Sequence, residues 1–217
     1  MEDEQFENIL NEFKKLYEIN LSQPTLPQQL PQFSEHVVFD LCQATKDRLV
    51  TYPKLIEITG NCFIIGDLHG NIFDLMRIMT KITFPLQNNL IFLGDYVDRG
   101  HFSVEVVVFL FALYCKFPDK VILLRGNHEL PDMNGSYGFQ DEIIELYQRD
   151  ALWYTFNNVF SYMPFGCLLN KNIFCVHGGI SSNLKTLDQI LELPPSVVNC
   201  KDEMIYDLLW SDPSSKD

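Results

Sequence analysis

The sequence is poor in basic residues and contains no long hydrophobic run. It has 16 lysines and arginines against 29 aspartates and glutamates, which gives a formal net charge of −13. A chain this acidic is not expected to bind nucleic acid or an anionic membrane surface. The longest apolar run, residues 106–115, is too short to span a bilayer and instead predicts a buried helix.

Signal-peptide features and paired cysteines are also missing from the sequence. The segment from Met1 to Glu4 is acidic and is not followed by the apolar stretch of a signal peptide. The 6 cysteines show none of the paired spacings of a metal site, so free thiols in a reducing compartment are expected. These features predict a cytoplasmic protein, with a nuclear location as the alternative.

Hydrophobic residues make up 47% of the chain, which is enough to build a sizeable core. Helical spacing of apolar residues predicts helices near residues 6–17 and 37–49, and three prolines lie between them, at positions 24, 27 and 31. We therefore expect an N-terminal helix with a proline-containing connection over residues 1–33 and a main domain over residues 34–217.

The main domain shows alternating strand and helix patterns. Short apolar runs predict four strands, near residues 62–65, 90–93, 121–124 and 173–176. Helical patterns between these strands predict three helices, near residues 72–80, 103–116 and 141–154. This alternation predicts an α/β fold.

A short polar motif follows each of the four expected strands. The motifs are GDLHG at residues 66–70, GDYVDRG at 94–100, RGNHE at 125–129 and HGG at 177–179. The ends of strands in an α/β sheet are common places for a ligand or metal site. A single Asp or Asn after a strand is usually a turn former. Four such motifs in succession instead favour one shared site.

Five residues of these motifs are candidate metal ligands. Asp67 and His69 are two positions apart, so an extended chain would direct both toward one cation together with Asp95. Asp95 could also bridge to a second cation held by Asn127 and His177. Oxygen and nitrogen donors without thiolate suit two divalent ions in a hydrolytic site, either manganese or an iron and zinc pair. Two such ions activate a shared hydroxide and polarise a phosphoryl oxygen, which predicts phosphoester hydrolysis.

Three further residues fit the remaining catalytic roles. His128 follows the candidate ligand Asn127 and is a candidate general acid for the leaving alkoxide. Asp98 is the best candidate to orient the imidazole of His128. Arg99 is a candidate phosphate ligand, because its planar guanidinium binds two oxygens at once. Glu129 is more simply a structural residue.

The four motifs together resemble the signature of the metal-dependent serine/threonine phosphoprotein phosphatases, within the calcineurin-like phosphoesterases. The resemblance extends from Leu41 through YGFQDE at residues 137–142 to LWSDP at residues 209–213. It implies two packed mixed β-sheets flanked by helices, over a metallophosphatase catalytic domain at residues 34–217. It also implies the ligand and acid assignments above, phosphoprotein substrates and regulatory subunits as partners.

The same resemblance implies a C-terminal portion that follows the LWSDP element in related proteins. That portion supplies another histidine ligand, a second arginine and a tyrosine near the site, and neither His36 nor His101 is a plausible replacement for the histidine. We therefore expect a C-terminally truncated catalytic domain with an incomplete second metal site.

Four interpretations follow from the motifs and this expected truncation. The preferred one is a protein serine/threonine phosphatase that hydrolyses phosphoserine and phosphothreonine with a metal-activated hydroxide. The first alternative is an inactive truncated pseudophosphatase that acts as a binding or scaffold protein, and the second is a fragment that does not fold stably. A dinucleoside-polyphosphate hydrolase is disfavoured by the YGFQDE and LWSDP elements.

Overall fold

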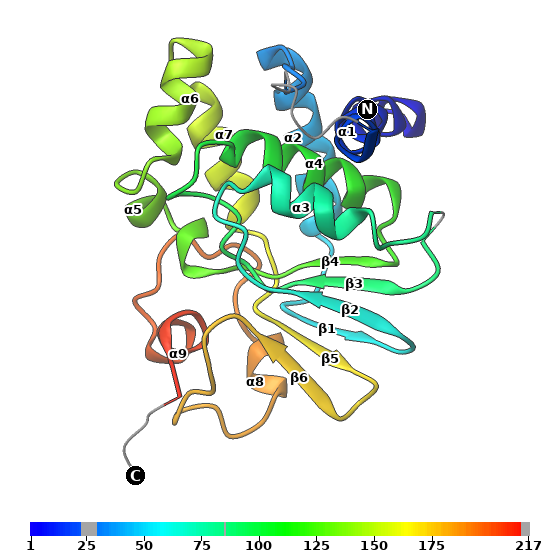
Figure 1. Ribbon diagram of the computed structural model, residues 1–217. Helices are drawn as coiled ribbons and strands as arrows, with labels where there is room; N and C mark the ends of the chain where they lie inside the picture. Colours follow the sequence, from blue (N-terminus) through cyan, green and yellow to red (C-terminus); the bar gives the residue numbers. More distant parts are fainter. Residues whose placement is uncertain (23–29, 85, 214–217) are drawn as a thin grey trace.

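The computed structural model describes residues 1–22, 30–84 and 86–213 and contains two three-stranded sheets (Figure 1). The first sheet has the order β2-β3-β4 and is parallel; its strands are Cys62–Ile65, Asn89–Phe92 and Val121–Leu123. The second sheet has the order β1-β5-β6; its strands are Leu55–Ile58, Gly166–Leu169 and Ile173–Val176. In this second sheet β1 and β5 are parallel and β6 is antiparallel to β5.

The two sheets pack face to face through a common apolar cluster. Both sheets and their flanking loops contribute to it, with Ile56, Ile91, Ile122, Leu124, Cys167, Leu169 and Cys175 as its buried members. Burial of apolar side chains between two sheets is the main stabilising interaction of such a sandwich. The predicted α/β fold is therefore confirmed.

Helices cover the outer side of each sheet (Figure 1). Most lie on the side of the β2-β3-β4 sheet: α1 Asp3–Ser22, α2 Glu35–Leu49, α3 Ile72–Met79, α4 Ser103–Lys116, α6 Phe139–Tyr147 and α7 Ala151–Phe160. Two lie beside the β1-β5-β6 sheet: α8 Asp188–Leu191 and α9 Glu203–Trp210. A short 3-10 turn, Asn127–Glu129, and the short helix α5, Pro131–Asn134, connect β4 to α6.

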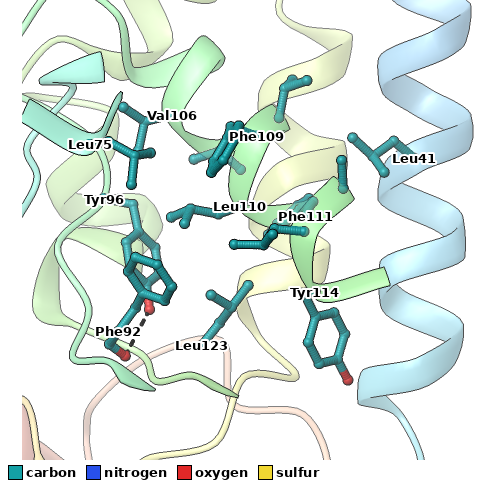
Figure 2. Packing of buried hydrophobic residues seen from close by; sticks show 14 of the residues in the cluster. Leu41, Leu75, Phe92, Tyr96, Val106, Phe109, Leu110, Phe111, Tyr114 and Leu123 are labelled. Atoms are coloured by element: carbon teal, nitrogen blue, oxygen red, sulfur yellow. Dashed lines mark hydrogen bonds between the residues drawn. The ribbon is translucent and has the colours of Figure 1, made fainter. Parts of the chain in front are cut away.

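Helix α4 lies at the centre of the larger core. Its residues from Ser103 to Cys115 are all buried, and the apolar run at residues 106–115 predicted a buried helix here. Figure 2 shows Phe109, Leu110 and Phe111 of this helix lying between Leu41 of α2 and the side chains of the β2-β3-β4 sheet. A helix that packs on several sides explains why this run lacks a polar face.

The four predicted strands and the helices at residues 72–80 and 103–116 are confirmed to within one residue. Both N-terminal helices are longer than predicted, and one predicted helix is wrong. The helix expected over residues 141–154 is two helices, α6 and α7. The break lies at Gln148, which has a left-handed backbone with φ of 59°. Apolar residues recur at helical spacing on both sides of the break, so periodicity alone could not reveal it. Strands β1 and β5 were missed because four-residue runs containing Glu57 or Gly166 give a weak strand pattern.

The N-terminal helix joins the core of the main domain. Phe6, Ile9 and Phe13 of α1 belong to the same buried cluster as α4. Pro24 and Pro27, expected to separate the first two helices, lie outside the described residues. The domain boundary at residues 33 and 34 stays a prediction. Over the described part of the chain, no helix is both long and apolar enough to cross a membrane.

Candidate metal centre and acid pair

Two glycines allow the loops after β3 and β4 to pack against each other. A Cβ atom on Gly94 would lie 2.3 Å from the backbone nitrogen of Gly126, and a Cβ on Gly126 would lie 2.3 Å from Oδ1 of Asp95. Neither position has room for a side chain, and the φ of 114° at Gly94 also favours glycine. This close approach brings Asp95 next to the turn that carries Asn127 and His128.

Four candidate site residues have a left-handed backbone, which is rare outside glycine. The φ values are 41° at His69, 55° at Asp95, 72° at Asp98 and 66° at Arg99. Such conformations are unfavourable by about 1–3 kcal/mol each and are concentrated at functional sites. The extended chain assumed between Asp67 and His69 is therefore wrong, because the polypeptide turns at His69. The turn is fixed by the His69 backbone N–H, which donates to the Asp95 carbonyl at 2.9 Å.

The first group of candidate metal donors surrounds the imidazole of His69. Its Nδ1 lies 2.9 Å from the carbonyl oxygen of Val97, so Nδ1–H donates and Nε2 carries the free lone pair. Nε2 lies 3.5 Å from Asp95 Oδ2 and 3.8 Å from Asp67 Oδ2. It is buried and has no hydrogen-bond partner. A buried acceptor facing two carboxylates fits a bound cation.

The second group of candidate donors is built in the same way around His177. Its Nδ1 lies 3.1 Å from the carbonyl oxygen of Leu93, which directs Nε2 toward Asn127 Oδ1 at 3.0 Å and Asp95 Oδ1 at 3.4 Å. One donor atom each of Asp67, Asp95 and His177 lies within 4.8 Å of the others. Without a cation, a rotated Asn127 amide would donate to His177 and Asp95 instead. The orientation with the amide oxygen facing these acceptors is the one that a cation stabilises.

His128 and Asp98 form a fully buried pair beside these donors. His128 Nδ1 lies 2.6 Å from Asp98 Oδ2, and the backbone N–H of Phe139 donates to Asp98 Oδ1 at 3.0 Å. Arg99 Nη2 lies 3.0 Å from His128 Nε2. Burial lowers the pKa of His128, but the hydrogen bond to Asp98 and the negative charge of Asp95 outweigh it, so the net pKa lies above its ordinary value.

Glu129 holds the loops of the site together. Its carboxylate accepts from the backbone N–H groups of Asp95, Tyr96 and Gly126 at 2.8, 2.8 and 2.9 Å. The carboxylate is fully buried, and burial together with the nearby charge of Asp95 raises its pKa. These contacts agree with a structural interpretation of Glu129 and make it the link between the β3 and β4 loops.

Two supporting residues could not be recognised from the motifs. Arg125 is fully buried, and its guanidinium donates to the carbonyl oxygens of Glu129 and Val197. Asn134 donates to the carbonyl oxygen of His128 at 3.1 Å and is itself held by Asn157. Arg125 directly follows a strand, as the candidate metal ligands do, so its position in the sequence did not distinguish a supporting residue from a ligand. Asn134 is the last residue of the short helix α5, where an asparagine is ordinary.

The glycines after His177 contact helix α9. A Cβ on Gly178 would lie 2.7 Å from the carbonyl carbon of Leu209, and the Gly178 N–H donates to the Leu208 carbonyl at 2.9 Å. These contacts bring the end of β6 against the start of the LWSDP element.

Comparison with known proteins identifies the family. Residues 61–217 match the model of the calcineurin-like phosphoesterases, and the chain belongs to this family. The chain is 40% identical over 172 residues to the serine/threonine-protein phosphatase PP1-delta of Caenorhabditis elegans. That match covers 79% of this chain and 56% of the relative, so the chain spans little more than half the relative's length.

Solved structures of phosphatases show the same fold. A protein serine/threonine phosphatase from Saccharomyces cerevisiae, described as similar to human phosphatase PP5, superposes with a TM-score of 0.82 and 25% identity. The superposition covers 94% of this chain and 66% of the yeast chain. A cold-active protein-tyrosine phosphatase of a Shewanella species superposes with a TM-score of 0.54 over 86% of this chain and 56% of its own, at 21% identity.

Proposed function

We propose that this chain is the catalytic part of a protein serine/threonine phosphatase, which hydrolyses phosphoserine and phosphothreonine in protein substrates. The main support is the buried pair of His128 and Asp98 close to the candidate metal donors around His69 and His177. The 40% identity to the PP1-delta phosphatase supports the same activity. A buried imidazole with a carboxylate partner is what protonation of an alkoxide leaving group requires.

The donor set fits two divalent cations. Asp67, His69 and Asp95 would hold one ion, and Asp95, Asn127 and His177 would hold the other. The mixture of carboxylate, amide and imidazole donors suits manganese or an iron and zinc pair. When bound, such ions supply Lewis acidity and lower the pKa of water enough to provide a nucleophile at neutral pH.

The protein's own groups would bind the phosphate and protonate the leaving oxygen. Asp98 holds Nδ1 of His128 at 2.6 Å, so Nε2 is the nitrogen available to donate a proton to the seryl or threonyl oxygen. Arg99 Nη2 lies 3.0 Å from the same Nε2. A phosphate bound by Arg99 would therefore place its ester oxygen close to the acid.

Phosphoprotein substrates, regulatory subunits as partners, and a cytoplasmic or nuclear location belong to the same proposal. The acidic composition, the unpaired cysteines and the likeness to PP1-delta support them. The pseudophosphatase alternative has no support from the comparisons. It differs from the proposed function in one respect that an assay can measure, which is turnover.

Replacement of His128 by asparagine tests the proposed role. With excess Mn²⁺, His128→Asn should lower kcat on a phosphothreonine peptide by about 10²- to 10⁴-fold, the range for loss of a general acid. The loss should be small on p-nitrophenyl phosphate, because p-nitrophenolate scarcely needs protonation to leave. Steady-state kinetics on both substrates gives the ratio of wild-type to variant kcat for each of them.

The control is another histidine outside the site. His36 is exposed and pairs with Asp40 on α2, so His36→Asn should change neither rate. Equal losses on the peptide and on the aryl ester would show that His128 is not the leaving-group acid. Wild-type protein inert toward both substrates would favour the pseudophosphatase alternative.

A further inference from the structure

A groove of about 710 Å³ extends from the proposed phosphate site along α6. One end is formed by Arg99 and Tyr137, which also border the proposed acid: Arg99 Nη2 lies 3.0 Å from His128 Nε2, and the rings of Tyr137 and His128 are 5.5 Å apart. A substrate segment that follows a phosphoresidue bound at Arg99 would therefore enter this groove. This geometry is the reason to ask what the groove recognises.

The groove is strongly acidic away from Arg99. Its carboxylates are Glu105 of α4 and Asp141, Glu142 and Glu145 of α6, whereas Arg99 is the one arginine or lysine that lines it within the described residues. Asp141 and Glu145 are exposed and lie one helical turn apart, so both project from the same face of α6.

Both oxygens of Glu142 accept hydrogen bonds, whereas one oxygen of Glu105 accepts none. Glu142 accepts from the backbone N–H groups of Ser103 and Val104 at 3.0 and 2.7 Å, which caps the start of α4. Glu105 is only 9% exposed, and its Oε2 is buried without any hydrogen-bond partner. A buried carboxylate oxygen is unfavourable without a donor. The lining of the groove thus includes a carboxylate oxygen that lacks a donor, and a bound cationic group would supply one.

The walls of the groove suit the aliphatic part of a long basic side chain. Leu30, Phe102 and Leu146 line it beside the carboxylates. Arginine and lysine bind in this manner, with their methylene stems on apolar surface and their charged ends at an acid. The combination of an apolar wall, exposed acids and one unsatisfied buried carboxylate matches that chemistry.

We propose that this groove is a specificity subsite, which binds an arginine or lysine close in sequence to the phosphoresidue. The inference rests on the proposed phosphatase function, because it names the class of phosphopeptide that the same site prefers. Phosphate at Arg99 and a basic side chain at the carboxylates of the groove would give substrate and groove complementary charges.

Phosphothreonine peptides with one arginine at successive positions on either side of the phosphoresidue test the subsite. Each peptide is matched by one with citrulline, which keeps the shape of arginine and removes its charge. At one or more positions, kcat/KM for arginine should exceed that for citrulline by about three- to tenfold, the range for one or two partly exposed ion pairs. The double variant Asp141→Asn, Glu145→Gln removes two of the four carboxylates that line the groove and should lower this ratio at those positions.

The matched control is Glu192→Gln, which removes an exposed carboxylate at the end of α8, beside the other sheet (Figure 1). This control should keep the wild-type ratio. The proposal is overturned if the wild-type ratio of kcat/KM for arginine over citrulline is near one at every position. It is also overturned if the double variant leaves this ratio unchanged.

Failure of the proposed function gives a different result. If no phosphopeptide and no aryl phosphate is hydrolysed, the phosphatase proposal fails, and the affinities of fluorescent arginine and citrulline phosphopeptides then decide the subsite. Tighter binding of the arginine peptide, lost in the double variant, would support the groove. Equal affinities for the two peptides would overturn it.

Discussion

The buried carboxylates of this protein differ in the number of hydrogen-bond donors that surround them. Glu129 accepts three backbone N–H groups, and Asp98 accepts from His128 and from the Phe139 backbone. Glu105 has a buried oxygen without a donor. The carboxylates of Glu129 and Asp98 fix the geometry of the site. The buried oxygen of Glu105 instead destabilises the folded protein, and a substitution at this position can measure by how much.

Replacement of Glu105 by glutamine should stabilise the protein more at alkaline than at acidic pH. Burial raises the pKa of Glu105 to about 7, and Glu142 adds to the shift, whereas Arg99 and His101 are the basic groups lining the same groove. The folded state therefore binds more protons than the unfolded state between about pH 4.5 and 7, and stability is lost as the pH rises through this range. The difference in the free energy of unfolding between Glu105→Gln and wild type should therefore increase by about 1–3 kcal/mol from pH 5 to pH 8.

Urea unfolding of wild-type and variant protein at the two pH values measures this difference. The exposed Glu192→Gln variant is the control and should differ from wild type by the same amount at pH 5 and pH 8. If Glu105→Gln also shows a constant difference, the carboxylate of Glu105 titrates normally in the folded state and our reading of its burial is wrong.

At the scale of secondary structure, the outer strands of the two sheets carry exposed apolar residues. In the part of the chain that the structure describes, β2 pairs only with β3, and β6 pairs only with β5. Phe63 and Ile64 of β2 are 40% and 48% exposed, and Ile173 of β6 is 47% exposed. An unpaired strand with apolar side chains promotes association with other chains.

A charged residue on β2 should therefore improve the behaviour of the purified chain. Phe63→Lys should lower the fluorescence of a hydrophobic dye and reduce aggregation on heating, because it removes exposed apolar surface and adds an edge charge. Asn61→Lys is the matched control, since it adds the same charge at an exposed polar position just before the strand. Similar improvement in both variants would attribute the effect to net charge, not to the apolar edge.

At the scale of the whole molecule, the proposed metal centre connects the two sheets. Asp67, Asp95 and Asn127 follow strands of the β2-β3-β4 sheet, whereas His177 follows β6 of the other sheet. A cation bound by residues from both sheets would link the two sheets, and it would bind the folded protein but not the unfolded chain. Binding at this centre should therefore contribute to the stability of the entire domain.

Addition of Mn²⁺ should raise the thermal unfolding temperature in a concentration-dependent manner. At a free concentration one hundred times the dissociation constant, one site adds about 2.7 kcal/mol to the free energy of unfolding. Asp95→Asn should abolish most of this increase, because the Asp95 carboxylate faces both His69 and His177. It should also abolish turnover.

Calorimetry with and without Mn²⁺ measures the shift in unfolding temperature. Asp119→Asn, at an exposed carboxylate away from the site, should keep the full stabilisation. An Asp95→Asn protein stabilised as strongly as the wild type would show that the ion binds elsewhere.

The sequence by itself determined the family, the α/β class and the residues of the candidate site. Four apolar runs each end at a motif of glycines and polar ligands, and this pattern is local, so it can be read without knowledge of the fold. The helix from Ser103 to Lys116 was recognised from a local pattern too, because its apolar run at residues 106–115 is longer than a typical strand.

Only the tertiary structure decided how those residues meet. The left-handed backbone of His69, the contact between Gly94 and Gly126, and the bonds from Glu129 to three separate N–H groups depend on contacts between distant segments. The break at Gln148 and the acidic groove beside Arg99 depend on packing between helices in the same way. Such contacts leave no periodic pattern in the chain, because their energy comes from neighbours in space and not from neighbours in sequence.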